Sequence, residues 1–174
     1  MYTDLVLFDV AQSPFNNIVY RTVKISNLKN YNSKNIVIIE GNSVNRDILE
    51  RDNVNILLSP HKDLKRDSMH FRNSGLNQVL CSISKKNNIA IGFSFSEFLN
   101  SNDRALILGK MQQNVRLCRK FKVKMVIASF AKNEYELRSI ETLKSFGYIL
   151  GMNPEEIKKS TEQGYLIAKD KLYK

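Results

Sequence analysis

Six short apolar runs are spaced along the chain, and a more polar stretch follows each of them. They cover residues 4–8, 18–25, 36–39, 54–58, 89–93 and 124–128. The last run is continuously apolar from Met125 to Ala128, as in a strand that is covered on both faces. The run 18–25 alternates apolar with polar residues, which is typical of an edge strand. The pattern therefore predicts six strands, with the second at an edge.

Between these runs, apolar residues recur every three or four positions, as on the buried face of a helix. The clearest set is Leu76, Val79, Leu80 and Ile83. Predicted helices cover 43–51, open at 73 or 74, run from 101 or 102 to about 121, and begin at 140 and 154. Ser139 and Asn153 are the expected caps of the last two, and Gly164 is expected to end the final helix.

Strands and helices that alternate in this way indicate parallel pairing and an α/β layer fold. Right-handed crossovers then allow either a doubly wound sheet or a barrel. The 174 residues suit one domain, but they are fewer than the roughly 250 of a standard (β/α)8 barrel. No linker divides the chain, so residues 1–174 are predicted to form a single α/β domain with a basic C-terminal tail at 165–174.

The charge of the chain points to a class of partner. Its 27 Lys and Arg residues exceed its 17 Asp and Glu residues, which gives a net charge of +10 and a pI near 9.6. Such an excess is typical of nucleic-acid binding, although some basic proteins are merely soluble. No apolar run approaches the roughly 20 residues of a membrane-spanning helix, and no signal-peptide pattern opens the sequence. We therefore expect an intracellular protein that binds nucleic acid and no membrane.

Residues suited to catalysis are sparse. A metal-dependent phosphoesterase needs several His and acidic ligands at strand ends, and the chain has only His61 and His70. His61 stands at a strand end, but without histidine partners we expect a polar loop residue or an RNA contact. Cys81 and Cys118 lack the spacing of a zinc or redox motif and are expected in the core. Nucleophile-elbow, Walker and dinucleotide-binding motifs are missing too, so we predict no catalytic residue and no metal site.

Two groups of basic residues are the candidate RNA contacts. Arg116, Arg119 and Lys120 fall three and four residues apart, on one face of the long helix. A solvated charged face is the alternative explanation of such a cluster. The second group, Lys132 and Arg138, flanks the loop after the last strand, where α/β folds place their working groups. Together the five residues are the predicted RNA-binding site.

The loop after the last strand carries signals of its own. Asn133 can cap a short turn, with Glu136 three residues later reaching back to it. Arg138 has an alternative role, because it can pair with Glu134 or Glu136 and hold the loop. In that case its loss would lower stability rather than affinity for RNA.

Three blocks of residues stand in order along the C-terminal two thirds of the chain. They are the segments 77–80 and 86–91, the basic helix end 114–121, and the set Ser129, Ala131, Tyr135, Leu137, Arg138, Ser139, Leu150, Gly151 and Met152. Together they resemble the archaeal ribonuclease P protein component 3 family, the counterpart of the thirty-kilodalton subunit of the eukaryotic enzyme. One position departs from the family pattern. Phe130 stands where the family usually has glycine, so it either closes an approach of backbone to phosphate or supplies a stacking surface.

The resemblance implies a compact TIM-barrel-like fold of mostly parallel strands and outer helices, shortened relative to a full (β/α)8 barrel. It implies a non-catalytic subunit of ribonuclease P, the cytoplasmic enzyme that removes the 5′ leader of precursor tRNA. The RNA subunit would perform hydrolysis with Mg²⁺, and this chain, with no cofactor of its own, would bind that RNA, protein component 2 and other ribonuclease P proteins, meeting precursor tRNA indirectly. Two alternatives remain open: a metal-dependent phosphoesterase on a similar barrel, and a protein–protein adaptor with incidental basic charge.

Overall fold

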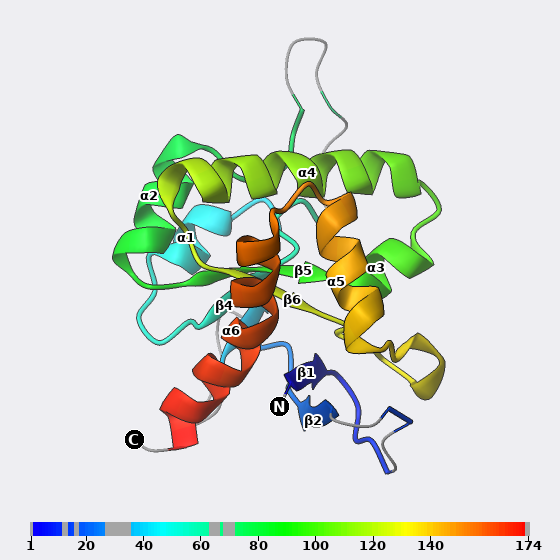
Figure 1. Cartoon of the computed structure of the whole chain (residues 1–174). Coiled ribbons are helices and arrows are strands. Elements are labelled where there is room, and N and C mark those ends of the chain that lie inside the picture. Colours follow the sequence, from blue (N-terminus) through cyan, green and yellow to red (C-terminus); the bar gives the residue numbers. More distant parts are fainter. Residues whose placement is uncertain are drawn as a thin grey trace.

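The computed structural model of the chain describes residues 2–11, 14–15, 18–26, 36–62, 67 and 72–172. Six parallel strands lie in this part of the chain, and helices surround them (Figure 1). The strands are β1 (Tyr2–Val6), β2 (Ile18–Thr22), β3 (Ile38–Glu40), β4 (Ile56–Leu58), β5 (Ala90–Ser94) and β6 (Met125–Ala128). Each strand overlaps one of the six predicted apolar runs, so the predicted α/β class and the positions of the strands along the chain are confirmed.

The helices mostly begin at residues with capping side chains. They are α1 (Asn45–Leu49), α2 (Gln78–Lys86), α3 (Phe95–Asn100), α4 (Arg104–Phe121), α5 (Ile140–Ile149) and α6 (Pro154–Leu172), and the 3-10 turn η1 (Glu134–Glu136) precedes α5. Ser139 caps α5 as predicted, because its Oγ accepts the N–H of Thr142 at 3.3 Å. The short helix α3 was not predicted. It follows β5 directly, and Ser94 caps it by accepting the N–H of Glu97 at 3.1 Å.

The helix α2 begins later than predicted, and its buried face differs as a result. Gly75 has a φ of +79°, which interrupts the chain before the helix, and Asn77 caps the first turn by accepting the N–H of Leu80 at 2.9 Å. The residues that α2 buries are therefore Cys81 and Ser84. Val79, which was predicted to be buried, is 55% exposed.

The C-terminal part of the chain is helical rather than a tail. Gly164 does not end α6, which continues to Leu172, so residues 165–172 belong to this helix. Gly164 is buried and faces Leu5 and the backbone of Thr3 in β1, so its small size serves packing rather than termination. In the described residues, no helix combines the length and the apolar character that a membrane span requires.

The strands form a shortened barrel from two parallel sheets. One sheet pairs β1 with β2, and the other has the order β3-β4-β5-β6. On one side the sheets meet just after β2, where Ile25 forms a parallel bridge with Ile38 of β3. This agrees with the expected edge character of the second strand, because its ladder pairs it with β1 alone. On the other side β1 approaches β6, and this seam completes the ring.

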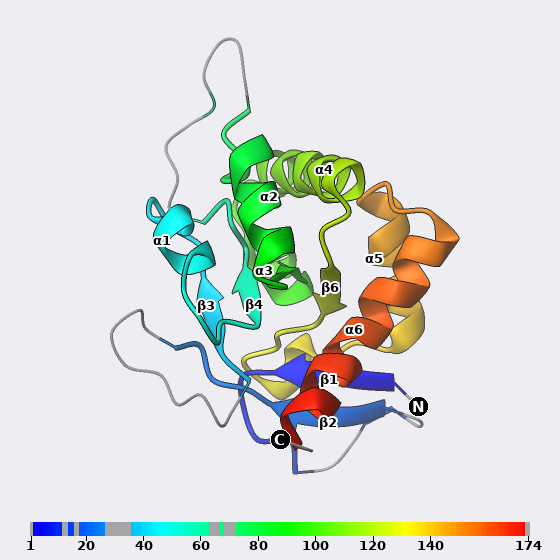
Figure 2. The same cartoon turned by 90° about the vertical axis from the view of Figure 1, so that its left-hand side faces the viewer.

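The seam between β1 and β6 is closed by loops and side chains instead of a regular ladder. The N–H of Phe130 donates to the carbonyl of Leu5 at 2.9 Å, and the N–H of Leu7 donates to the carbonyl of Ala131 at 2.8 Å. Lower in the barrel, Tyr2 Oη donates to the carbonyl of Ile127 at 3.3 Å. The helix α6 packs against both strands, as Figure 2 shows. A six-stranded barrel can therefore close because one helix covers the place where two strands diverge.

Alternate strand residues form two cores on opposite faces of the strands. One core lies under the helices and includes Ile39, Leu57, Ile91, Phe93 and Ile127 with buried residues of the surrounding helices. The inner core includes Ile38, Ile56, Leu58, Ala90, Val126, Ala128 and Phe130, and it is joined by Ile167 and Ala168 of α6. Both cysteines are buried, as predicted, and burial raises the pKa of the Cys81 thiol to about 11.

Candidate functional site

The barrel mouth, at the carboxyl ends of the strands, is where barrel enzymes place their catalytic groups. A cavity of about 240 Å³ lies there. Its described lining residues include Glu40, Ser59, Lys62, Ser94, Ser96, Glu97, Asn100, Phe130 and Lys132. The mouth therefore has polar chemistry, and the question is whether its groups are open to a ligand or occupied with one another.

The first cluster in the mouth joins β4 to α3. Glu97 accepts a hydrogen bond from Ser59 Oγ, and its Oε1 lies 3.3 Å from His61 Nε2, within ion-pair range but without hydrogen-bond alignment. Burial alone would raise the pKa of Glu97, but His61, Ser59 and Lys62 favour the charged form and lower it. Lys62 itself pairs with Glu40 at 2.5 Å. This cluster links neighbouring loops by internal contacts.

His61 was expected to be a polar loop residue or an RNA contact; it does lie in the turn after β4, but it is buried there and not open to RNA. The residue is only 4% exposed and lies beside Glu97 of α3. The carbonyl of Pro60 is held there by the Asn45 side chain at 2.7 Å. His70, the other histidine, lies outside the described residues. In the described ranges, no three His, Cys, Asp or Glu side chains come together in a set that could hold a metal ion.

The second cluster in the mouth is built around Glu136, which fixes the loop after β6. Its carboxylate accepts from Ser96 Oγ, from Asn100 Nδ2 at 2.8 Å and from the N–H of Lys132 at 2.8 Å. Asn133 Nδ2 adds a contact of 3.2 Å. The turn predicted at Asn133 is thus present, with the roles changed: the Asn133 side chain donates to Glu136 and does not cap. Burial would raise the pKa of Glu136, but these hydrogen bonds lower it.

Lys132 and Arg138 occupy the two ends of this loop and differ in exposure. The Lys132 side chain is exposed, and no partner for its ammonium group is found among the described residues. Arg138 donates to the carbonyls of Tyr135 and Leu137 at 2.7 and 2.6 Å, and it lies 5.4 Å from the ring centroid of Phe95. Arg138 therefore holds the loop, as the alternative proposed, but through carbonyls and an aromatic ring instead of Glu134 or Glu136.

The position of Phe130 decides between the two roles expected for this residue, which were closing an approach of the backbone to phosphate and supplying a stacking surface. Its φ is +45°, in the left-handed region that favours glycine. Its side chain is 1% exposed and lies in the inner core. The ring therefore seals the barrel from within and cannot serve as a stacking surface for a base.

The predicted basic face of α4 divides into an open part and a paired part. Arg116 and Lys120 are exposed, and Lys120 lies 5.6 Å from the ring centroid of Phe121. Arg119 instead forms a two-pronged ion pair with Glu156 of α6, with both N–O distances at 2.7 Å. It also donates to the carbonyl of Gly151 at 2.7 Å. The acidic partner comes from another helix, which is why spacing along α4 could not reveal it.

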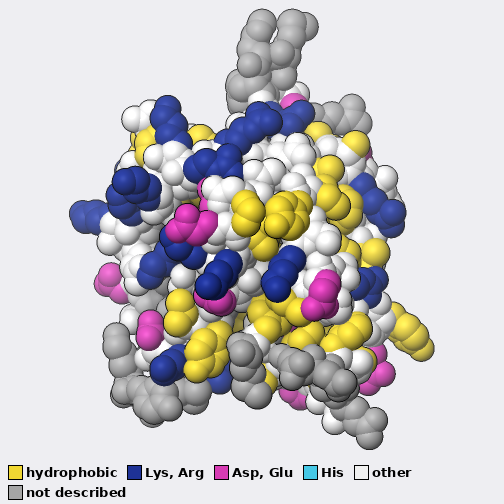
Figure 3. All heavy atoms as spheres, viewed as in Figure 1, with side chains coloured by type: hydrophobic (Ala, Val, Ile, Leu, Met, Phe, Trp, Pro, Cys, Tyr) yellow, Lys and Arg dark blue, Asp and Glu magenta, His cyan; other side chains and the backbone are white. Residues whose placement is uncertain are grey.

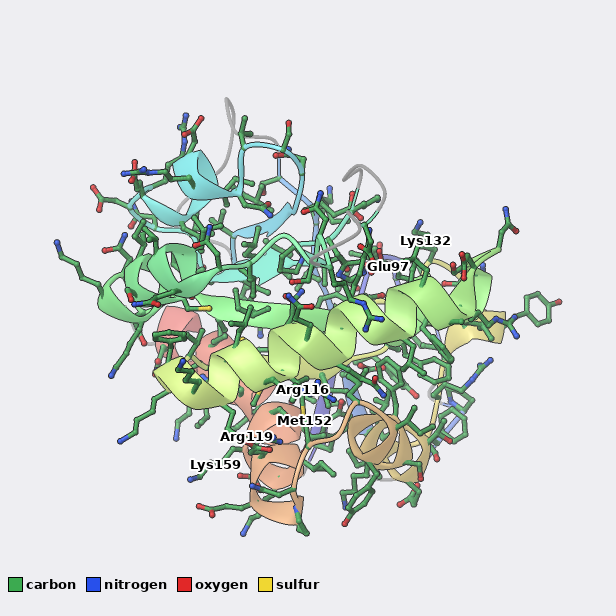
Figure 4. All side chains as sticks on the ribbon, turned by 90° about the horizontal axis from the view of Figure 1, so that it is seen from above. Glu97, Arg116, Arg119, Lys132, Met152 and Lys159 are labelled. Atoms are coloured by element: carbon green, nitrogen blue, oxygen red, sulfur yellow. The ribbon has the colours of Figure 1, made fainter. Side chains whose placement is uncertain are left out.

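The structure separates the two predicted basic groups. Arg116 and Lys120 lie near the end of α4, which leads into the start of β6, whereas Lys132 follows the opposite end of β6. Figure 4 shows Lys132 and Glu97 toward one end of α4, and Arg119 toward the other end, beside Met152 and α6. In Figure 3, Lys and Arg side chains are numerous on the upper part of the face, where α4 crosses it.

Sequence reasoning missed the acidic residue at the centre of the first mouth cluster, Glu97. Its helix, α3, is too short for a periodic pattern, and its partners Ser59 and His61 come from a distant loop. A local signal did exist: Ser94 stands three residues before Glu97, the spacing of a capping box. Asn133 stands at the same spacing before Glu136, and that signal correctly predicted the turn.

Comparison with known proteins gives one consistent family. A family model described as RNase P subunit p30 matches residues 21–167. Ribonuclease P protein component 3 of Methanosarcina acetivorans is 34% identical over 146 residues, which cover 80% of this chain and 58% of that protein. The same component of Methanocaldococcus jannaschii is 31% identical over 140 residues, which cover 78% of this chain and 57% of that protein. The chain thus spans little more than half the length of these curated relatives.

A solved structure shows a similar fold. One chain of a cryo-EM structure of archaeal ribonuclease P with mature tRNA aligns with a TM-score of 0.70 and 30% sequence identity. The alignment covers 79% of this chain and 58% of that chain. The compact, shortened α/β barrel is therefore shared with that protein.

Proposed function

The chain belongs to the RNase P subunit p30 family, and from this we propose that it is a non-catalytic protein subunit of ribonuclease P. It would bind the RNA subunit and so support removal of the 5′ leader from precursor tRNA. The match of the family model over residues 21–167 carries the proposal. The open cations Arg116, Lys120 and Lys132 supply the chemistry, because cations placed between crowded phosphates offset their repulsion.

The arrangement of the barrel mouth supports a binding role without catalysis by this chain. The carboxylates at the centres of the two mouth clusters, Glu97 and Glu136, accept hydrogen bonds that fix loops, whereas a general base needs a free lone pair directed at a substrate. We propose that hydrolysis belongs to the RNA subunit and that the Mg²⁺ it uses is held by RNA. The complex would act as an endonuclease in the cytoplasm.

The proposed partners follow the same assignment. The ribonuclease P RNA is the direct partner, together with ribonuclease P protein component 2 and other proteins of the complex. Precursor tRNA would be met indirectly, through the assembled particle. The basic surfaces fit the RNA part of this proposal, since phosphate contacts position a protein on RNA without reading its sequence.

Purification of the tagged protein from its own cells, followed by sequencing of the bound RNA, tests this function. We expect the ribonuclease P RNA, with an affinity that falls steeply as salt rises. Replacing Arg116, Lys120 and Lys132 together by alanine should flatten the slope of log K against log salt by roughly 2 to 3. Zinc or manganese bound at one ion per chain would favour a metal-dependent phosphoesterase. Weak RNA binding at low salt would favour a protein–protein adaptor.

A further inference from the structure

A second, larger cavity lies outside the barrel mouth. It is a groove of about 710 Å³ between α1, the segment 72–77, the start of α2 and the outer side of α4. Its described lining residues include asparagines, glutamines, serines and two arginines, but neither Asp nor Glu. We call it the α2–α4 groove. Its size falls within the range of pockets that enclose a small ligand.

The floor of the α2–α4 groove is fixed by side-chain amides. Asn45 Nδ2 donates to the carbonyl of Gly75 at 2.9 Å, and Asn114 Nδ2 donates to the carbonyl of Ser74 at 2.8 Å. Gln113 Nε2 reaches the carbonyl of Arg72 at 3.3 Å. Because the carbonyls of Arg72, Ser74 and Gly75 are already occupied, the floor is preformed. The donors there are the Ser74 hydroxyl and the first N–H groups of α2, and Asn114 Oδ1 is a buried acceptor with no hydrogen-bond partner.

Several of these donors suit an anion. Ser74 is 1% exposed, and its Oγ has no hydrogen-bond partner although it lines the groove. The first N–H groups of α2, at Gln78 and Val79, have no carbonyl within the helix to bond, and they form its positive end. A buried hydroxyl beside a helix N-terminus is a favourable place for a phosphate oxygen.

Two arginines stand at the rim of the groove in weak ion pairs. Arg46 pairs with Glu50 at 2.7 Å, and Arg72 pairs with Asp67 at 3.5 Å. The Arg46 side chain is 66% exposed, and exposed pairs of this kind contribute little. A phosphate can therefore replace either carboxylate at small cost. Along α4, Arg116 and Lys120 lie within one turn of the lining residues Gln113 and Leu117. The groove is therefore next to the exposed basic residues of α4.

One wall of the groove is apolar. Val79 is 55% exposed, and Leu80 and Leu117 beside it are half-buried. Exposed apolar side chains beside hydrogen-bond donors suit a nucleotide. The apolar side chains can contact the flat face of the base, and the donors can bind the phosphate. Proteins meet these features together where RNA is unpaired, because a duplex keeps its base faces stacked inside.

We propose that the α2–α4 groove binds an unpaired nucleotide of an RNA loop or bulge. The base lies against Val79 and Leu117, and the phosphate lies at Arg46, Arg72 and the N-terminus of α2. This assignment rests on the proposed function, because it makes the groove one contact site for the RNA subunit. It adds recognition of RNA shape to the phosphate contacts of α4.

An NMR titration of the 174-residue chain with a single-stranded RNA of about six nucleotides tests the groove. We expect the amide signals of Ser74, Gln78 and Val79 to shift, and a hairpin stem of the same composition to shift them far less. Replacing Arg46 and Arg72 by alanine should lower the slope of log K against log salt by about 0.7 for each phosphate that is no longer neutralised. Val79→Glu should weaken oligonucleotide binding without unfolding, because the side chain is exposed.

The matched control is Lys159→Ala. Lys159 forms an ion pair with Glu155 four residues away on α6, as Arg46 of α1 does with Glu50, the residue that follows α1, but Lys159 lies away from the groove. Its loss should leave oligonucleotide binding unchanged. Shifts confined to other surfaces, equal binding of the duplex stem, or complete competition by inorganic phosphate would overturn the proposal. If the ribonuclease P RNA still binds in those cases, the proposed function stands; if no RNA binds, both fail.

Discussion

The barrel mouth and the outer side of α4 both carry charged residues, but those of the mouth clusters are paired within the protein and those of α4 are left exposed. In the mouth, Glu97 and Glu136 are enclosed and accept hydrogen bonds from their neighbours. On the outer side of α4, Arg116 and Lys120 are exposed, and among the described residues neither has an acidic partner. Buried polar groups must be satisfied by partners in the protein, whereas exposed cations cost little to leave open. The enclosed carboxylates of the mouth therefore stabilise the fold, whereas the exposed cations of α4 are available for binding.

This difference means that the chain has a barrel fold but uses its mouth in another way than barrel enzymes do. Barrel enzymes keep titratable groups of the mouth poised toward a substrate. Here the pKa values of Glu97 and Glu136 are both lowered, chiefly against burial, by the hydrogen bonds that hold the loops. Both carboxylates therefore stay ionised and serve as anchors. If the comparison is right, mutations of the enclosed mouth residues Glu97, Glu136 and Phe130 change stability, and mutations of the exposed cations of α4, Arg116 and Lys120, change affinity for RNA.

The largest expected loss of stability comes from Phe130→Ala. The ring is 1% exposed and packs in the inner core, so its removal should lower the free energy of unfolding by about 3–5 kcal/mol. Denaturant unfolding measures this. Phe130→Gly is the informative companion, because glycine suits the φ of +45° and should recover roughly 1 kcal/mol relative to alanine. A loss below about 1 kcal/mol for alanine would mean that the ring does not seal the mouth.

The next effect concerns Asp4, a buried carboxylate at the seam between β1 and β6. Its Oδ1 accepts the N–H of Ser129 at 2.7 Å, and its Oδ2 has no hydrogen-bond partner. Burial raises its pKa from an ordinary 3.8 to about 6, in spite of the hydrogen bonds from Ser129. The folded state therefore holds the proton more tightly than the unfolded state. The stabilisation from this group is complete below about pH 4 and is lost as the pH rises through 6.

Asp4→Asn should remove this pH dependence while keeping the seam contact through the amide oxygen. Relative to the unmodified chain, the variant should gain up to about 3 kcal/mol in free energy of unfolding between pH 4 and pH 8. Unfolding of both proteins at these two pH values gives the difference, and other titrating groups cancel. A difference that does not vary with pH would show that the seam admits water to the carboxylate.

Most of the architecture could be predicted from the sequence because it depends on local patterns. The apolar runs located every strand, and the cap at Ser139 located α5. The errors concern choices that packing decides between distant segments. Gly164 looks like a helix end in sequence but packs against β1, and the face of α2 that is buried depends on a turn at Gly75 and its neighbours.

The candidate site was harder to predict for the same reason. Lys132 and Arg138 were placed correctly at the end of β6, but only the fold shows that Arg138 is occupied by carbonyls of its own loop. Arg119 looked equivalent to Arg116 because spacing along one helix cannot report a carboxylate on another. Charge count thus predicts a nucleic-acid partner, and tertiary contacts decide which cations are left exposed.

The smallest expected effect on stability, and the sharpest test of the comparison, lies in the pair Arg119→Ala and Arg116→Ala. Arg119 is held between Glu156 and the carbonyl of Gly151. Its loss should cost about 0.5–1 kcal/mol of unfolding free energy, as partly exposed ion pairs do. It should leave the salt slope of RNA binding nearly unchanged. Arg116→Ala should do the reverse, with stability within about 0.5 kcal/mol and a salt slope lower by about 0.7–0.9.

Both variants remove the same side chain from the same helix, three residues apart, so helix propensity and net charge are matched between them. Denaturant unfolding and salt-dependent binding of the ribonuclease P RNA together give two numbers for each variant. Equal flattening of the slope by both variants would mean that the Glu156 ion pair opens on RNA and that pairing does not decide which cations bind. An unchanged salt slope of RNA binding for Arg116→Ala would mean that the exposed basic face of α4 is a solvated surface. RNA contact would then depend on Lys132 and on the α2–α4 groove.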